Sequence, residues 1–140
     1  MKKSQFIQTA LLILIGAFLT ACADSASAAL TGSWKLVSYG SPANPTPAAP
    51  NVEASLTFGK DGLVSGSVGC NSFSGDYKVK GDALIFGMLA TTEMACDEPL
   101  MQQESAVFRV IGVTTSFKIE GDTLTLISAD GNSIAAFIRK

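Results

Sequence analysis

Residues 54–68 read ASLTFGKDGLVSGSV, two apolar runs around a turn that contains Gly and Asp. The runs are 54–58 and 63–68, and the residues between them, GKDG, tolerate the left-handed backbone conformations that tight turns need. This pattern predicts an antiparallel β-hairpin. A chain of 140 residues has the length of one domain, so the hairpin belongs to a single core.

The same alternation of strand and turn continues on both sides of the hairpin. Upstream, residues 30–39 predict a strand with Trp34 and Leu36 on one face. Downstream, the expected strands are 73–79, 83–86, 116–119, 124–127 and 134–138. Consecutive hairpins at short intervals favour a meandering antiparallel sheet that curls toward a barrel, which limits exposed strand edges.

Residues 97–111 break this rhythm with helical spacing. Asp97 is a candidate N-cap, Pro99 suits the first turn, and apolar residues recur every three or four positions. The apolar face of the helix needs a partner, and the sheet is the only large one available. We therefore predict an α+β fold, a small antiparallel β half-barrel with one packed α-helix.

Two segments are expected to lie outside this fold. Residues 22–29 are small and polar, which suits a flexible tether. Residues 41–51 contain four prolines. Because proline lacks the N–H of a sheet ladder, this segment is expected to form an exposed loop or extended connector.

The N-terminus resembles a bacterial lipoprotein leader. Lys2 and Lys3 precede a mostly apolar run over 6–18, which is short for a membrane span of about 20 residues. The sequence LTAC over 19–22 then resembles a lipobox, in which Cys22 is lipidated and cleavage precedes it. The predicted organisation is a lipoprotein signal peptide over 1–21, the tether over 22–29 and one domain over 30–140.

This resemblance implies an outer membrane lipoprotein that faces the periplasm, since Ala23 is not the Asp that often causes inner-membrane retention. The membrane would then be a partner through the lipid anchor. The alternative is cleavage after Ala26-Ser27-Ala28, which would leave a soluble periplasmic protein.

Composition excludes several classes of chemistry. The chain has no His, so imidazole catalysis and His-based zinc sites are excluded, and we expect no metal or cofactor. Loss of Lys2 and Lys3 shifts the formal net charge from −2 to about −4, so nucleic acid is not an expected partner. Asp residues beside Gly lack the spacing of a calcium loop and are interpreted as turn residues.

Once Cys22 is lipidated, Cys70 and Cys96 remain as an even pair in an exported protein. A disulfide is the default expectation, and it would stabilise the fold by about 3 to 4 kcal/mol. A reactive dithiol would have C-x-x-C spacing, and a metal site would need further clustered ligands.

Glu104 falls on the apolar stripe of the predicted helix, where a carboxylate is costly unless it is hydrogen-bonded. We interpret it as a structural acceptor tied to Asn71, Trp34 or nearby backbone amides; the alternative is a polar anchor in a ligand pocket. Gly69 and Gly75 are expected to permit close backbone approach. Asn71 is interpreted as a turn residue between them.

The segments GCNSFSGDY (69–77) and ATTEMAC (90–96), followed by Glu104 and Phe108, resemble the META domain (HslJ-like) family of bacterial envelope proteins. The resemblance covers about 30–138 and implies a small antiparallel β-domain with one helix and paired cysteines. Its motif positions in this sequence are Trp34, Gly69, Asn71, Gly75, Tyr77, Glu104 and Phe108.

The expected function is therefore a non-catalytic, lipid-anchored envelope protein that binds an unknown protein, peptide or lipid in envelope stress tolerance. A groove between helix and sheet near Phe73, Met101 and Phe108 is the expected place for that partner. The alternative from another class is a Ser/Lys-type hydrolase, which would require a Ser within hydrogen-bond reach of a desolvated Lys.

Overall fold

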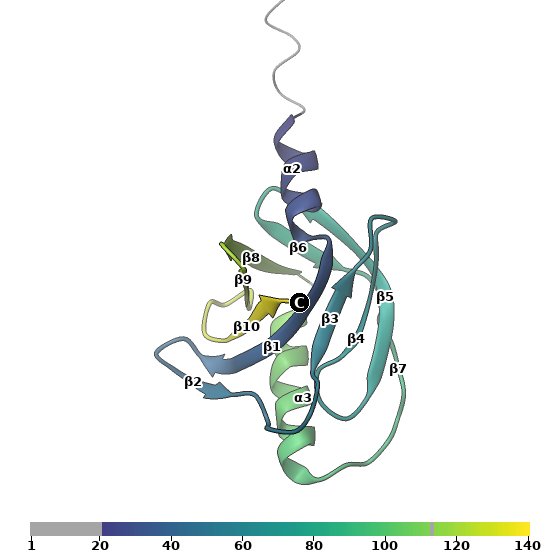
Figure 1. Cartoon of the computed structure of the whole chain (residues 1–140), viewed down its shortest axis with the longest axis vertical. Coiled ribbons are helices and arrows are strands. Elements are labelled where there is room, and N and C mark those ends of the chain that lie inside the picture. The colour runs from purple at the N-terminus through teal and green to yellow at the C-terminus, as the bar shows by residue number, and fades with distance from the viewer. Residues whose placement is uncertain (1–20, 113) are drawn as a thin grey trace, which may run out of the picture.

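The computed structural model describes the backbone of residues 21–112 and 114–140, and the side chains of 25–112 and 115–140 (Figure 1). Within these residues the helices are α2 (Ala21–Leu30), which precedes the strands, and α3 (Glu98–Ile111), which lies between β7 and β8. The strands are β1 (Gly32–Ser41), β2 (Asn44–Pro47), β3 (Ser55–Phe58), β4 (Leu63–Ser67), β5 (Ser72–Lys80), β6 (Ala83–Phe86), β7 (Ala90–Thr91), β8 (Thr114–Glu120), β9 (Thr123–Ile127) and β10 (Ile134–Arg139).

The strands form a closed antiparallel barrel. Its order is β1-β3-β4-β5-β6-β8-β9-β10, and β10 pairs back onto β1 from Trp34↔Arg139 to Gly40↔Ile134. Two further strands lie outside this closed order: β2 pairs with β1, and β7 pairs with β5. The predicted α+β fold with a packed helix is confirmed, and the sheet curls further than a half-barrel because its first and last strands pair.

The hairpin over 54–68 forms as predicted. β3 and β4 pair as far as Phe58↔Val64, and the turn between them contains Gly62 at φ +80°. The carboxylate of Asp61 accepts the N–H of Leu63 at 3.1 Å, so Asp61 acts within the turn.

Asp130 also acts as a turn residue. Its carboxylate accepts the hydroxyl of Ser128 at 2.6 Å and the N–H of Asn132 at 3.0 Å. These two hydrogen bonds hold the pKa of Asp130 below its ordinary value, because they favour the charged form.

The barrel interior is apolar and continuous. Trp34 and Leu36 are buried on the same face of β1, as the alternation predicts. Phe58 packs edge-to-face against Tyr77 with ring centroids 5.0 Å apart. The Tyr77 hydroxyl donates to the Gly59 carbonyl at 2.8 Å, so this motif residue fastens the β3–β4 turn to β5.

The prediction that the proline segment stays outside the ladder is wrong. β2 pairs with β1 through Ser38↔Pro47 and Gly40↔Pro45. The pairing is possible because β2 is an edge strand, where a proline nitrogen can face away from its neighbour.

The prediction of a flexible tether over 22–29 is wrong, because this segment is helical. Ala is the strongest helix former, and α2 is rich in it. Its C-terminal end is fixed to the barrel: the Trp34 indole N–H donates to the Leu30 carbonyl at 2.8 Å, and Arg139 donates to the Ala29 carbonyl at 2.8 Å. Arg139 also lies 4.1 Å above the Trp34 ring. A cation at the last carbonyls of a helix is stabilising.

Residues 1–20, which hold most of the predicted signal peptide, lie outside the described residues, as does the side chain of Cys22. Lipidation of Cys22 therefore stays a prediction. Among the residues that the structure describes, no helix is long and apolar enough to cross a membrane.

Replacing Trp34 by Ala should lower the free energy of unfolding by about 3 to 5 kcal/mol, because the fully buried indole leaves a cavity. Val37→Ala is the control on the same strand; Val37 is 36% exposed, so its effect should stay near 0.5 kcal/mol. Urea denaturation measures both, and equal effects would contradict the assignment of Trp34 to the core.

Candidate functional site

Helix α3 covers the end of the barrel opposite α2 (Figure 1). It begins one residue after Asp97 and ends at Ile111, as the sequence predicts, with Pro99 in its first turn. Asp97 occupies the N-cap position, but its side chain makes no capping hydrogen bond. The buried face of α3 carries two polar residues among its apolar ones, Gln103 and Glu104.

The carboxylate of Glu104 is bound to Asn71, in the turn between β4 and β5. It accepts the backbone N–H of Asn71 at 2.5 Å and the side-chain amide of Asn71 at 2.8 Å. This confirms the expected structural acceptor: of the predicted partners, the Asn71 side chain and a backbone amide of the adjacent loop bind Glu104. Both residues are buried, and the bonds offset the cost of removing a carboxylate from water.

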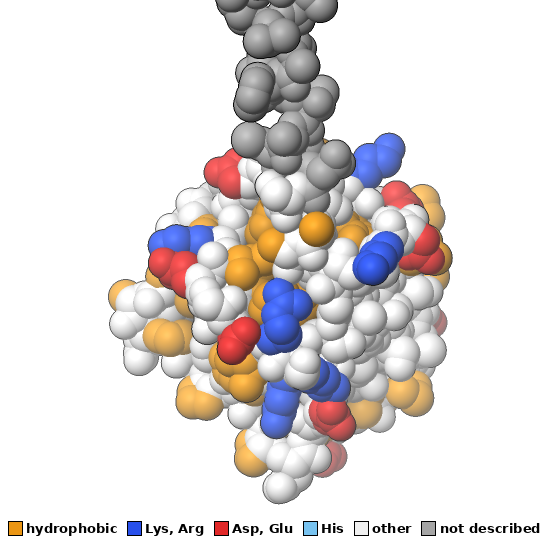
Figure 2. Space-filling model, turned by 45° about the horizontal axis from the view of Figure 1, so that its top comes forward, with side chains coloured by type: hydrophobic (Ala, Val, Ile, Leu, Met, Phe, Trp, Pro, Cys, Tyr) orange, Lys and Arg blue, Asp and Glu red, His pale blue; other side chains and the backbone are white. Residues whose placement is uncertain are grey.

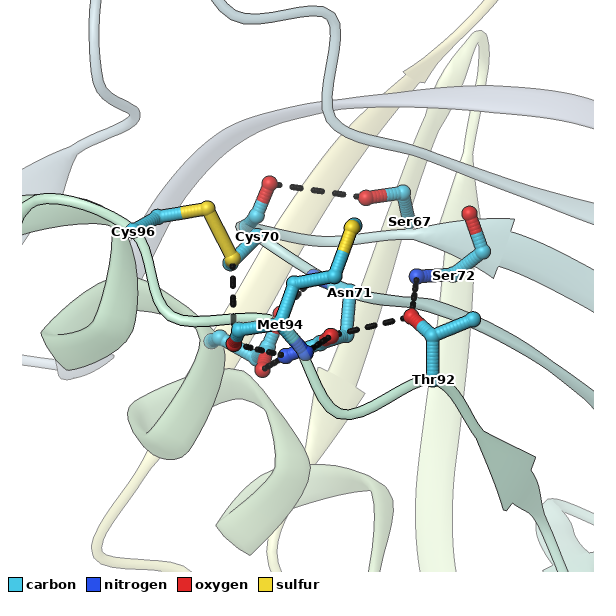
Figure 3. The surroundings of a disulfide bond; sticks show 9 residues. Ser67, Cys70, Asn71, Ser72, Thr92, Met94 and Cys96 are labelled. Atoms are coloured by element: carbon cyan, nitrogen blue, oxygen red, sulfur yellow. Dashed lines mark hydrogen bonds between the residues drawn. A yellow bond between two sulfur atoms is a disulfide. The ribbon is translucent and has the colours of Figure 1, made fainter.

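The side-chain amide of Asn71 also forms hydrogen bonds with the segment that leads from β7 to α3 (Figure 3). Its oxygen accepts the backbone N–H of Met94 at 2.7 Å and the Thr92 hydroxyl at 2.9 Å, and its nitrogen donates to the Met94 carbonyl at 3.3 Å. A side-chain amide that bonds both backbone groups of one residue acts like a strand neighbour. Asn71 therefore does more than the turn chemistry expected of it.

The two motif glycines permit close contacts here, as predicted. A Cβ added to Gly69 would lie 2.6 Å from both the Cβ of Glu104 and the carbonyl of Leu100 in α3. A Cβ added to Gly75 would lie 2.7 Å from the Met88 carbonyl. Both distances are shorter than real Cβ contacts, so a side chain at either position would push the neighbouring segment away.

The predicted disulfide is present. Cys70 and Cys96 are bonded with an S–S distance of 2.00 Å and a Cα–Cα distance of 5.8 Å (Figure 3). The bond joins the β4–β5 turn to the residue two places before α3. It closes the same junction as the hydrogen bonds of Asn71, so one covalent and several polar links hold one segment.

Gln103 is a site residue that the sequence analysis missed. Its side-chain amide donates to the Val68 carbonyl at 2.8 Å and accepts the Ala49 N–H at 2.7 Å. It therefore joins α3 both to the end of β4 and to the proline segment. Its place beside Glu104 on the buried stripe was the available signal.

Two adjoining hollows lie between α3 and the segment over 86–95, and they share Leu89 and Phe108. Their volumes are about 610 and 560 Å³. We call them together the helix groove, which is lined by Asn71, Phe86, Gly87, Met88, Leu89, Thr91, Thr92, Glu93, Met94, Ala95, Met101, Glu104, Phe108, Ile111 and Gly112.

The helix groove lies where the sequence predicts it. Met101 and Phe108 line it, while Phe73 is buried beneath and packs edge-to-face on Phe108 at 5.4 Å. Met88 is 92% exposed and Met94 is 53% exposed. Such flexible, solvent-exposed Met side chains adapt to apolar partners of different shapes.

The charged side chains that line the helix groove are acidic. They belong to Glu93 and Glu104, and the second of these is hydrogen-bonded to Asn71. Within the described residues, no group of three or more Cys, Asp or Glu could hold a metal ion.

Comparison with known proteins identifies the family. The family model for the META domain matches residues 28–140, which is most of the chain. The chain belongs to the META domain family. Asn71 and Glu104, two positions of the resemblance noted in the sequence, are the hydrogen-bonded partners described above.

Solved structures with the same fold support this assignment. A protein from Burkholderia xenovorans, determined by NMR, is similar with 26% identity and a TM-score of 0.68, over 83% of this chain and 87% of that one. A DUF4847 family protein from Bacteroides vulgatus has 14% identity and a TM-score of 0.58, over 79% of this chain and 94% of that one, and shows the fold alone. No curated protein matches the sequence.

Glu104→Gln should lower the free energy of unfolding by about 1 to 3 kcal/mol, because the new amide N–H₂ leaves one Asn71 donor unpaired in a buried site. Glu98→Gln makes the same change at an exposed position of the same helix and should cost about 0.5 kcal/mol or less. Equal losses in denaturant titrations would refute the Asn71–Glu104 pairing.

Reduction of the Cys70–Cys96 disulfide should lower the melting temperature, since the bond contributes about 3 to 4 kcal/mol. Scanning calorimetry with and without dithiothreitol measures the shift. A double variant, Cys70→Ser with Cys96→Ser, should melt at the lower temperature in both conditions. A wild-type melting temperature that does not respond to reductant would rule out this stabilisation.

Proposed function

We propose that this META protein is a non-catalytic, lipid-anchored protein of the outer membrane that faces the periplasm and binds a protein, peptide or lipid partner during envelope stress. The observation that carries the proposal is the helix groove: an open, largely apolar surface on a backbone held by a disulfide and buried hydrogen bonds. Pre-formed apolar clefts of this kind bind ligands without large rearrangement.

The position of the helix groove relative to α2 supports this role. α2 extends from one end of the barrel and α3 starts at the other end (Figure 1). A lipid on Cys22, near the start of α2, would hold the barrel by the end that lies away from the start of α3. The fixed contacts of Trp34 and Arg139 with α2 would transmit that orientation to the barrel.

Charge does not favour attachment of the barrel to an anionic membrane surface. On the face that carries α2, basic and acidic side chains are interspersed (Figure 2). The predicted mature chain has a formal net charge of about −4, which opposes such binding. Several acyl chains on Cys22 would satisfy the need for more than one hydrophobic signal in stable anchoring.

The lining of the helix groove favours binding over the hydrolase alternative. It contains neither a Ser nor a Lys among the described residues, so the pair that a Ser/Lys mechanism needs does not meet there. The amide of Asn71 and the carboxylate of Glu104 are bound to each other and to the chain. META domains are also not a known catalytic family.

Cys22→Ser should move the full-length protein from the membrane to the soluble fraction and abolish its acylated mass, because the thiol is the proposed attachment point. Ala28→Leu is the matched control: it blocks cleavage after residue 28 and should leave fractionation unchanged. Mass spectrometry and sucrose-gradient fractionation measure both variants. Membrane association of Cys22→Ser, or a soluble wild type processed after Ala28, would overturn the anchor.

A further inference from the structure

Among the described strands, β7 pairs with β5 alone, and its other edge borders the helix groove. β7 pairs with β5 through Phe73↔Thr91 and Ser74↔Ala90, so β5 covers one edge of β7. In an antiparallel ladder, the backbone groups of successive residues point alternately toward and away from the neighbouring strand. The hydrogen bonds of some N–H groups in the segment over 90–94 therefore show which way the N–H groups between them point.

Those partners fix the alternation. The N–H of Thr92 donates to the Ser72 carbonyl at 3.0 Å, and the N–H of Met94 donates to the Asn71 side chain at 2.7 Å. Both point toward the barrel. The N–H groups of Thr91 and Glu93 accordingly point to the opposite edge. Because Asn71 holds Met94, the extended edge continues past the two residues of β7.

The outward edge runs beside an apolar surface. Thr91 and Glu93 line the helix groove together with Met101 and Phe108 of α3. An extended chain lying there could exchange backbone hydrogen bonds with the edge and place alternate side chains against the apolar floor. These are the two requirements of peptide recognition by strand addition.

We propose that the helix groove binds an extended apolar peptide segment with a basic residue, which adds as a strand to the outer edge over 89–93. This inference rests on the proposed binding function and names its partner. The charge of the site selects the basic residue, because the charged side chains in the lining are Glu93 and Glu104. The occupant is a segment of another protein.

The same features disfavour a lipid. A fatty acid or an anionic phospholipid would bring its negative headgroup toward the Glu93 carboxylate, and like charges at a binding site oppose association. An acyl chain also carries no donors or acceptors to satisfy the outward backbone groups of Thr91 and Glu93. A peptide backbone supplies both donors and acceptors.

The test uses the mature protein purified from the envelope, in phosphatidylcholine vesicles. The probe is a synthetic nonapeptide of alternating valine and threonine with a lysine at each end, and the comparison probes are its glutamate-ended version and laurate. Titration calorimetry should show the lysine peptide binding at least roughly tenfold more tightly than the glutamate peptide. Glu93→Gln should reduce that preference, and Glu98→Gln, outside the groove lining, should not.

Thr91→Pro tests the strand edge itself. The one backbone N–H that it removes points away from β5, so the fold should be retained while affinity for the lysine peptide falls by roughly tenfold or more. Thr91→Ala keeps the N–H and should bind like the wild type. Independently of any variant, hydrogen–deuterium exchange at Thr91 and Glu93 of the wild type should slow when the peptide is added.

Three results would overturn the inference: no binding of the lysine peptide, laurate binding in its place, or unchanged exchange at Thr91 and Glu93 in the complex. Failure of the anchor is a separate outcome. Membrane retention of Cys22→Ser together with tight peptide binding would reject the lipid attachment and leave the strand-addition site standing.

Discussion

The buried pair of Asn71 and Glu104 is the constraint on which the functional end of this protein depends. Glu104 accepts both N–H groups that Asn71 directs at α3, and the Asn71 oxygen accepts the Met94 N–H. The Asn71 side chain therefore joins the β4–β5 turn to α3 and to the segment before α3. Removing either partner would leave buried polar groups unpaired, which costs more than the bond itself contributes.

The disulfide, the glycines and Gln103 surround this pair and serve the same junction. Cys96 ties the segment before α3 to Cys70, next to Asn71. Gly69 lets the turn approach α3 within a distance that no Cβ would allow, and Gln103 adds a second polar link from α3 to Val68. The result is an exposed strand edge, held rigidly beside an apolar groove at the end of a closed barrel.

The sequence predicted the local features well, because hairpins and helices are set by residues near one another. The strand 83–86, the helix starting after Asp97 and the cysteine pair were all confirmed. Barrel closure was not foreseen in full, because the pairing of β10 with β1 joins opposite ends of the domain. β2 differed because an edge position admitted prolines. α2 differed because its Ala-rich composition favours a helix, whose C-terminal end Trp34 and Arg139 fix to the barrel. Asn71 was among the predicted partners of Glu104, whereas the partners of Gln103, Val68 and Ala49, are set by tertiary packing and were not predicted.

Hydrogen–deuterium exchange of the free wild-type protein, read at single-residue resolution at Glu93 and Met94, tests directly whether Asn71 holds the segment before α3. Both side chains are exposed, so their amides differ mainly in direction. The Met94 amide, bound to the Asn71 side chain, should exchange at least roughly tenfold more slowly than the outward Glu93 amide, after correction for intrinsic rates. Equal exchange at the two amides would contradict this role of Asn71.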